Sequence, residues 1–372
     1  MSKPGGTPKV QSAIEFHATR YWPQLDGLRT LSVALVIFSH MGDPVWSGVN
    51  GSLGVTLFFV ISGFLITSLL IREERRNGRV SLSKFYVRRV YRIVPLYYIA
   101  VALTAVAVFG LGLGVGSGNF AERLPLIATF NGEFAGSGTF SHSWSLGIEE
   151  KFYILWPLVA FALPFVIRKR AVLVAVLLPL VAAASYIPGL RYFGIYTAIV
   201  AGCALAIAMH SDRGFRAAQA LARPRAFYPI LALAVLVYLV DQSLPFARET
   251  GHAHVAFAIA TALVFPGLII GGSAIQRVLS WRPIAYVGTL AYGIYLFHPF
   301  CIDVVGLVLP AGETSIALAA LRFLLAAMLS VGVAFGLHKL IEQPFIRLGR
   351  RLTTTDSKPG TMPASETIAT IR

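Results

Sequence analysis

The chain has 372 residues, of which 56% are hydrophobic and only 13% are charged. With a mean hydropathy of +0.70 it is too apolar for a soluble domain, and the composition also excludes disordered, collagen-like and disulfide-rich classes. The formal net charge of +15 is compatible with either nucleic-acid binding or a membrane protein, so the positions of the basic residues have to decide between the two.

Apolar windows long enough to cross a bilayer follow one another along the chain. They cover residues 25–41, 52–71, 93–112, 144–166, 171–187, 192–209, 227–240, 254–272, 284–309 and 316–338. The sequence therefore predicts an all-α, polytopic integral membrane protein with about ten transmembrane helices. The polar ends predict loose tails over residues 1–20 and 352–372, on either side of one transmembrane domain over residues 21–351.

Basic residues gather on one side of the predicted bundle. When the connecting segments alternate between two sides, 27 of the 32 Lys and Arg residues fall on the side of both termini. Only Arg123, Arg191 and Arg248 fall on the other side. The positive-inside rule then places both termini in the cytoplasm and the stretch 112–143 outside. Membrane topology explains the net charge, so we expect no nucleic-acid partner, and the first span is predicted to be a retained helix.

Ionisable side chains within apolar spans are costly and therefore mark cavities, ion pairs or functional sites. Arg29 and His40 are eleven residues apart, which returns to nearly the same helix face and separates them by about 16 Å. Both can line one groove, although a snorkelling Arg29 and a packing His40 are the alternatives. Glu149 is predicted near the level of His40, where a carboxylate can orient an imidazole.

Other polar residues in the spans have simpler interpretations. Asp303 and Arg322, in adjacent spans, predict a structural ion pair. His298 and Asp303 have the H-x4-D spacing of glycerolipid acyltransferases, but five residues on a helix leave them about 140° apart. His252 and His254 are too few ligands for a closed metal site, so no bound metal is expected.

Several segments share their order and spacing with one known family. Leu25-Asp26-Gly27-Leu28-Arg29 is followed by His40, and the later segments are GVTLFFVISGFLI (54–66), FYVRRVYRIVP (85–95), WSLGIEEKFY (144–153) and YGIYLFH (292–298). Together they resemble the membrane acyltransferase 3 family, bacterial enzymes that O-acylate sugars, surface glycans and some macrolides. Lys151 stands where a Gln is more usual in that family.

The resemblance implies that residues 21–351 are a transmembrane O-acyltransferase domain. Its catalytic residue would be His40, as a general base or an acyl carrier, with Glu149 assisting. The implied donor is cytoplasmic acyl-CoA, most simply acetyl-CoA, because guanidinium groups suit its phosphates. The donor-binding residues would be Arg29, Arg89 and Arg92, and the supporting residues Asp26 and His298. No permanently bound cofactor is expected.

The implied acceptor is a hydroxyl of a sugar, surface glycan or glycosylated metabolite, possibly lipid-linked, and membrane lipids are the other expected partners. The implied location is the plasma or bacterial inner membrane, crossed several times. The chain stops soon after the last span, so we expect transfer to be completed in the membrane domain or by a partner protein. A transporter or flippase of an anionic or acylated substrate is the main alternative, and a noncatalytic assembly scaffold is the third.

Overall fold

The computed structural model describes residues 10–19, 21–114, 119–167, 169–243, 252–312 and 315–354, without the side chains of residues 164, 241–243, 252 and 253. Within these ranges every regular element is helical and there is no strand. The α-helices are α1 (Ala13–Ala18), α2 (Pro23–His40), α3 (Gly51–Asn77), α4 (Leu82–Ala105), α5 (Phe120–Ala128), α6 (Trp144–Phe161), α7 (Pro164–Ile167), α8 (Arg170–Ala184), α9 (Arg191–Gly194), α10 (Thr197–Met209), α11 (Asp212–Ala222), α12 (Pro224–Ser243), α14 (His252–Ile270), α15 (Ala274–Leu279), α16 (Arg282–Thr289), α17 (Ala291–Gly306), α18 (Ile316–Leu337) and α19 (Gln343–Thr353). Short 3-10 or π-helical turns are η1 (Pro44–Trp46), η2 (Val106–Gly110), η4 (Gly132–Phe134), η5 (Ser141–Ser143) and η6 (His338–Glu342).

Several of these helices have the length and composition of membrane spans. Within the described residues four qualify: Gly51–Asn77, Leu82–Gly110, Arg191–Met209 and Ile316–Thr353. Two bent pairs raise the number to six if each pair is one span: Asp212–Ala222 with Pro224–Val240, and Arg282–Thr289 with Ala291–Gly306. The predicted all-helical membrane protein is confirmed, whereas ten transmembrane helices and cytoplasmic termini stay predictions.

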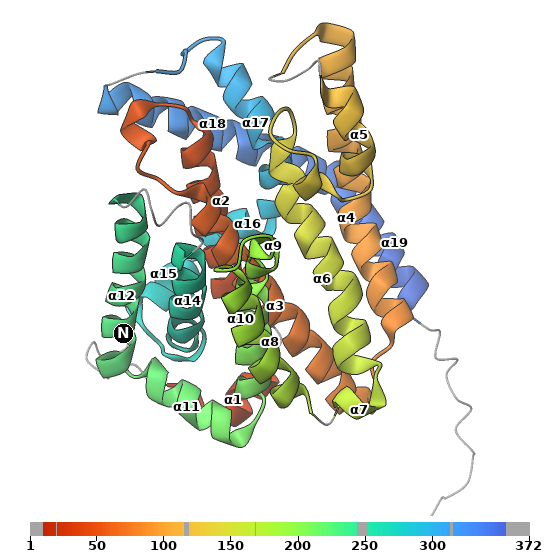
Figure 1. Ribbon diagram of the computed structural model, residues 1–372, viewed down its shortest axis with the longest axis vertical. Coiled ribbons are helices and arrows are strands. Elements are labelled where there is room, and N and C mark those ends of the chain that lie inside the picture. Colours follow the sequence, from red (N-terminus) through yellow and green to blue (C-terminus); the bar gives the residue numbers. More distant parts are fainter. Residues whose placement is uncertain are drawn as a thin grey trace, which may run out of the picture.

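Helix α2 lies in the middle of the bundle and contacts α3, α15, α16 and α17 (Figure 1). Two glycines allow the close contacts at its beginning. A Cβ on Gly27 would lie 2.1 Å from the Leu279 carbonyl oxygen of α15, and one on Gly288 of α16 would lie 1.8 Å from the Asp26 carbonyl oxygen. These contacts fix the first turns of α2 against α15 and α16.

Helices α3 and α10 also approach each other through small residues. A Cβ on Gly63 would lie 2.0 Å from the Ile199 carbonyl oxygen, and a Cβ on Gly202 would lie 2.2 Å from the Val60 carbonyl oxygen. Helices in a bilayer gain packing contacts when small residues let their backbones come close. The α3–α10 pair therefore forms a tight support beside α2.

Residues 10–19, within the range 1–20 for which a loose tail is predicted, contain a packed helix; residues 1–9 and 20 lie outside the described residues. Helix α1 lies within that range, and its Phe16 is fully buried. The Arg72 guanidinium of α3 donates to the carbonyl oxygens of Phe16 and Thr19, at 3.0 and 2.6 Å, and stacks over Trp22 at 4.0 Å. Phe16 and Arg72 thus anchor residues 10–19, although the polarity of this segment predicts a loose tail.

The stretch between α4 and α6 forms a folded cap at the upper end of the view in Figure 1. Arg123 of α5 is buried and donates to three carbonyl oxygens, those of Ala135, Gly136 and Thr139, at 2.8, 3.0 and 2.9 Å. These bonds satisfy most of its donors without a carboxylate. Residues 115–118, within the predicted external loop, lie outside the described residues.

We expect Gly63→Ala and Gly202→Ala each to destabilise the protein by about 1–3 kcal/mol, because the new methyl group overlaps the backbone of the facing helix. The matched control is Gly332→Ala in α18, where an added Cβ meets nothing within 4 Å. This control should leave stability unchanged or raise it by up to about 1 kcal/mol. Thermal unfolding of the purified variants, followed by tryptophan fluorescence, measures the difference. Equal shifts in all three variants would contradict this account of the α3–α10 contact.

Candidate active site

His40 is the last residue of α2, and its side chain is exposed. Its Nδ1 lies 2.8 Å from the carbonyl oxygen of Val36. Because a carbonyl oxygen only accepts hydrogen bonds, this contact assigns the proton of the neutral ring to Nδ1. The other nitrogen, Nε2, then keeps its lone pair and is the atom able to accept a proton or an acyl group.

Three imidazole rings lie in contact at this end of the bundle, which we call the histidine end. The ring of His40 is 4.9 Å from that of His298 in α17, and His298 is 5.4 Å from His142 in η5. The Nδ1 of His298 lies 2.8 Å from the Tyr295 carbonyl oxygen. The Nε2 atoms of His298 and His142 are buried and have no hydrogen-bond partner among the described residues. Sequence reasoning placed His298 near the site but missed His142.

The surroundings of His142 keep its imidazole ring neutral. Burial, and then the nearby His40, lower the pKa of His142 to about 3. His142 therefore carries no charge at neutral pH, so it leaves His40 free of a permanent cationic neighbour on that side. Among the described residues, no group of three or more His, Cys, Asp or Glu side chains is arranged to hold a metal.

A buried ion pair holds the chain directly after His40. The Arg322 guanidinium of α18 bonds the carboxylate of Asp43, and the two side chains are only 1% and 0% exposed. Arg322 also donates to the carbonyl oxygens of Leu309 and Met41, at 2.8 and 3.3 Å. The backbone N–H of Gly312 donates to the same carboxylate at 3.2 Å. The end of α2 is thus tied to α18 by a well-bonded pair.

The predicted ion pair between Asp303 and Arg322 is therefore wrong. Asp303 is exposed on the outer surface of α17, whereas His298, five residues earlier, is fully buried. This separation agrees with the angle of about 140° that excluded an H-x4-D motif. Arg322 points inward instead, where Asp43 is the carboxylate within reach.

At the opposite end of α2, which we call the basic end, Arg29 bonds the carboxylate of Asp26. The Tyr21 hydroxyl donates to the same carboxylate at 2.6 Å. Burial, followed by this hydrogen bond, raises the pKa of Tyr21 to about 12, so the hydroxyl keeps its proton at neutral pH. Asp26 therefore pairs with Arg29 and with Tyr21, and its supporting role in the reaction stays a prediction.

The two arginines of the 85–95 segment lie at the same end. Arg89 is close enough to Arg29, Arg92 and Glu149 to interact with their charges. Its guanidinium also stacks over the ring of Tyr153, 5.1 Å from the centroid. The structure thus brings together Arg29, Arg89 and Arg92, three residues that the sequence analysis assigned to donor binding.

A cavity of about 300 Å³ opens beside this cluster and is rich in guanidinium groups. Its charged lining residues are Glu73, Arg76, Arg88, Arg89, Arg92 and Arg350. Arg350 comes from α19, and Arg76 comes from the end of α3. From the sequence, only Arg89 and Arg92 of this lining were assigned to donor binding. Arg350 was missed because α19 packs beside α4 through a tertiary contact.

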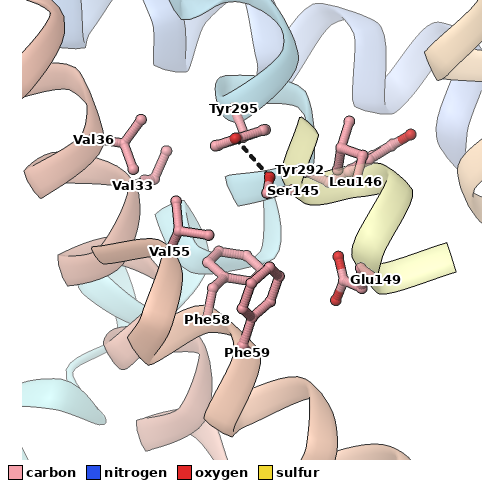
Figure 2. Close-up of a pocket in the computed structure, with 10 residues that line it drawn as sticks. All are labelled: Val33, Val36, Val55, Phe58, Phe59, Ser145, Leu146, Glu149, Tyr292 and Tyr295. Carbon is pink, nitrogen blue, oxygen red and sulfur yellow. Dashed lines mark hydrogen bonds between the residues drawn. The ribbon is translucent and has the colours of Figure 1, made fainter. Parts of the chain in front are cut away.

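A narrow passage of about 30 Å³ lies between the two ends of α2. It is lined by Val33 and Val36 of α2, Val55, Phe58 and Phe59 of α3, Ser145, Leu146 and Glu149 of α6, and Tyr292 and Tyr295 of α17 (Figure 2). Val33 and Val36 are four and seven residues after Arg29. His40 follows four residues after Val36. This spacing keeps all four on one helix face, of which Val33 and Val36 line the mostly apolar passage, so a groove that Arg29 and His40 share stays a prediction.

Glu149 does not lie where the sequence analysis placed it. Its carboxylate accepts hydrogen bonds from Ser62 of α3 and from Tyr153, and Figure 2 shows it across the passage from Phe58. The reason is the length of α6, which begins at Trp144, so that Glu149 lies about 7.5 Å further along its axis. The hydrogen-bond partners of Glu149 are thus Ser62 and Tyr153 rather than His40, and the Arg89 guanidinium is close enough to interact with its charge.

Lys151, the departure from the usual family pattern, has its own partners. Its ammonium lies 2.5 Å from the Glu133 carboxylate and 3.0 Å from the Phe130 carbonyl oxygen. Tyr192 donates to the same carboxylate at 3.1 Å. This ion pair ties the folded cap to α6, so Lys151 contributes to structure and lies outside the passage.

The fold and this site define a helical membrane protein with contacting histidines at one end of α2 and clustered arginines at the other. Residues 22–339 match the sequence model of a family described as "Acyltransferase domain". The chain therefore belongs to this acyltransferase family, as the motifs indicate.

Curated relatives refine this comparison. The chain is similar to a putative peptidoglycan O-acetyltransferase, YrhL, of Bacillus subtilis, with 30% identity over 76% of this chain and 49% of the relative. The peptidoglycan O-acetyltransferase OatA of Listeria monocytogenes is 28% identical over the same shares, and the O-acetyltransferase OatA of Staphylococcus aureus is 30% identical over 90% of this chain and 59% of the relative. The chain thus spans about half of the length of these relatives. No solved structure matches it.

We expect Arg322→Met to destabilise the protein by about 3–5 kcal/mol, because it leaves the Asp43 carboxylate buried without its cationic partner. Adding Asp43→Asn removes that charge and should restore part of the loss. Thermal unfolding of the single and double variants measures this coupling. If the double variant is less stable than Arg322→Met, the buried charge is not the cause of the loss.

Proposed function

We propose that the protein is a membrane O-acetyltransferase that moves an acetyl group from acyl-CoA to a hydroxyl of a peptidoglycan-type glycan. One observation carries this proposal: Arg29, which is close to Arg89 of the arginine cluster, and His40, whose Nε2 is free, lie on one face of α2, and Val33 and Val36 between them line the passage. The family match supports acyl transfer. The names of the relatives support acetyl as the group and peptidoglycan as the acceptor.

The basic end would bind the charged part of the donor. Coenzyme A carries several phosphate charges, and the arginine-lined cavity offers fork-shaped donors for them in Arg89 and Arg92, with Arg29 close to Arg89. The thioester would then extend along the apolar face of α2. The separation of about 16 Å between Arg29 and His40 is comparable with the reach of a pantetheine arm. The passage is narrow, so Phe58 and Phe59 have to move aside when the arm enters.

His40 would supply the chemistry. Its Nε2 takes the proton of the acceptor hydroxyl while the oxygen attacks the thioester carbonyl, and the ester C–O bond forms as the C–S bond breaks. The imidazolium then returns the proton to the leaving thiolate, so that the products are the acetyl ester and free coenzyme A. Transient acetylation of the same Nε2, followed by transfer to the hydroxyl, gives the same products.

The other site residues would position these groups. Glu149 bonds Tyr153, whose ring stacks against Arg89, so Glu149 acts at the donor end as a positioning residue. His298 packs against His40 and limits the orientations of its ring.

The distribution of basic residues supports a cytoplasmic basic end and a location in the bacterial inner membrane. Acyl-CoA made in the cytoplasm then reaches the arginine-lined cavity directly, while the histidine end faces outward toward the glycan. Charged residues within the spans are also typical of a transporter or flippase. Membership of an acyltransferase family favours an acyltransferase over that alternative.

For His40→Gln we expect folded protein with acetyl transfer reduced about 100- to 10,000-fold, because an amide does not titrate near neutral pH. His17→Gln is the matched control and should keep wild-type activity, since His17 is exposed in α1 and its ring lies against His210 and Phe215. Ester-linked acetate formed from acetyl-CoA by purified protein measures the rate. If His40→Gln retains more than about a tenth of the wild-type rate, His40 is not the general base, and His298 becomes the candidate for that role.

The double variant Arg89→Lys/Arg92→Lys tests the donor cavity. Lysine keeps both charges but loses the bidentate geometry of guanidinium, so we expect KM for acetyl-CoA to rise about tenfold or more. Arg216→Lys, exposed on α11, is the control and should not change KM. A double variant with wild-type KM would show that these arginines only set orientation in the membrane.

A further inference from the structure

A second cavity, of about 360 Å³, lies beyond the passage at the histidine end. We call it the outer cavity, and its polar lining residues are Ser39, His40, Ser47, Asn50, Ser52 and His254. Along α2 it follows the passage, because Val36 lines the passage and His40 lines the outer cavity. Along α3 the order is the same, with the outer cavity at its first turn. His40 therefore lines the outer cavity one helix turn beyond Val36 of the passage.

The chemistry of the outer cavity differs from that of the basic end. Among the described residues, its lining contains hydroxyl, amide and imidazole groups but no Lys, Arg, Asp or Glu. The arginine-lined cavity suits a polyanion, whereas this lining suits a neutral ligand that is rich in hydroxyl groups. Its volume falls in the range of about 300–1,000 Å³ that is usual for small-ligand sites.

The wall opposite His40 is held in place by hydrogen bonds. The Nε2 of His254 lies 3.3 Å from the Ser52 hydroxyl, and its Nδ1 lies 3.0 Å from the Thr56 hydroxyl. The Asn50 side chain accepts from the backbone N–H of Ser52 at 3.0 Å and so caps α3. Polar groups fixed in this way can recognise a ligand without first losing side-chain entropy.

We infer that the outer cavity is the acceptor site and binds a neutral sugar unit of a glycan, with one hydroxyl directed at Nε2 of His40. This inference rests on the proposed function and adds the acceptor-binding residues Asn50, Ser52 and His254. In the reaction the hydroxyl proton passes to His40, the new ester bond forms and the thioester C–S bond breaks. His254 thus has a ligand-binding role, where the sequence analysis considered only a metal.

Direct binding tests this site independently of catalysis. The full chain in lipid nanodiscs is titrated calorimetrically with a soluble probe, a β-1,4-linked oligomer of N-acetylglucosamine, and separately with acetyl-CoA. Ser47→Trp, which fills the cavity, should weaken probe binding at least about tenfold. His254→Ala should weaken it about fivefold, because the Ser52 and Thr56 hydroxyls lose the ring that holds them and the ligand then has to order them. Val308→Trp, at a residue that is 80% exposed and outside the cavity lining, should bind the probe like wild type.

Acetyl-CoA binding and the thermal midpoint should stay unchanged in all three variants, which shows that they fold. The inference is overturned if wild type does not bind the probe, if both cavity variants bind it like wild type, or if acetyl-CoA binding falls in parallel with probe binding. Probe binding that depends on the cavity, in a wild-type protein without acetyl transfer, upholds the site and refutes the proposed function. The two ideas can therefore fail separately.

Discussion

The rise and twist of one α-helix constrain the whole site. Helix α2 turns about 100° per residue, so steps of four, three and four residues return to the same face. Arg29 begins this face, two valines continue it and His40 ends it, and the helix between them is rigid. The walls supplied by α3, α6 and α17 are arranged around that face. A charged group and an imidazole are thereby held at a set separation with an apolar surface between them.

Two different physical means hold the ends of α2. At the basic end, Gly27 and Gly288 let α15 and α16 approach the backbone of α2 closely. Dispersion contacts between the backbones hold the helices together there. At the histidine end, a buried ion pair between Arg322 and Asp43 replaces packing, and it is tolerable because both groups are also bonded to the backbone. Because neither end can slide, the position of His40 relative to the passage is set by the fold.

The polarity of the lining differs between the basic end, the passage and the histidine end. The arginine-lined cavity is cationic, the passage is mostly apolar and the outer cavity is polar but uncharged. In the proposed reaction this difference separates the substrates, because burying phosphate charges in the apolar passage costs more than leaving them among guanidinium groups. The donor can therefore send only its neutral arm toward His40, and the acceptor meets that arm from the other side.

The sequence by itself determined the helical membrane class, the shared face of Arg29 and His40, and the family, because hydropathy and spacing along one helix are local properties. Only the tertiary structure decided that Arg322 pairs with Asp43 and not with Asp303, and that Glu149 bonds Ser62 and Tyr153. These partners lie on different helices, and the rotation of one helix against another depends on how side chains from distant segments pack. For the same reason the sequence does not predict the outer cavity. Its walls come from the end of α2 and the start of α3, and from the start of α14, which follows more than 200 residues later in the chain.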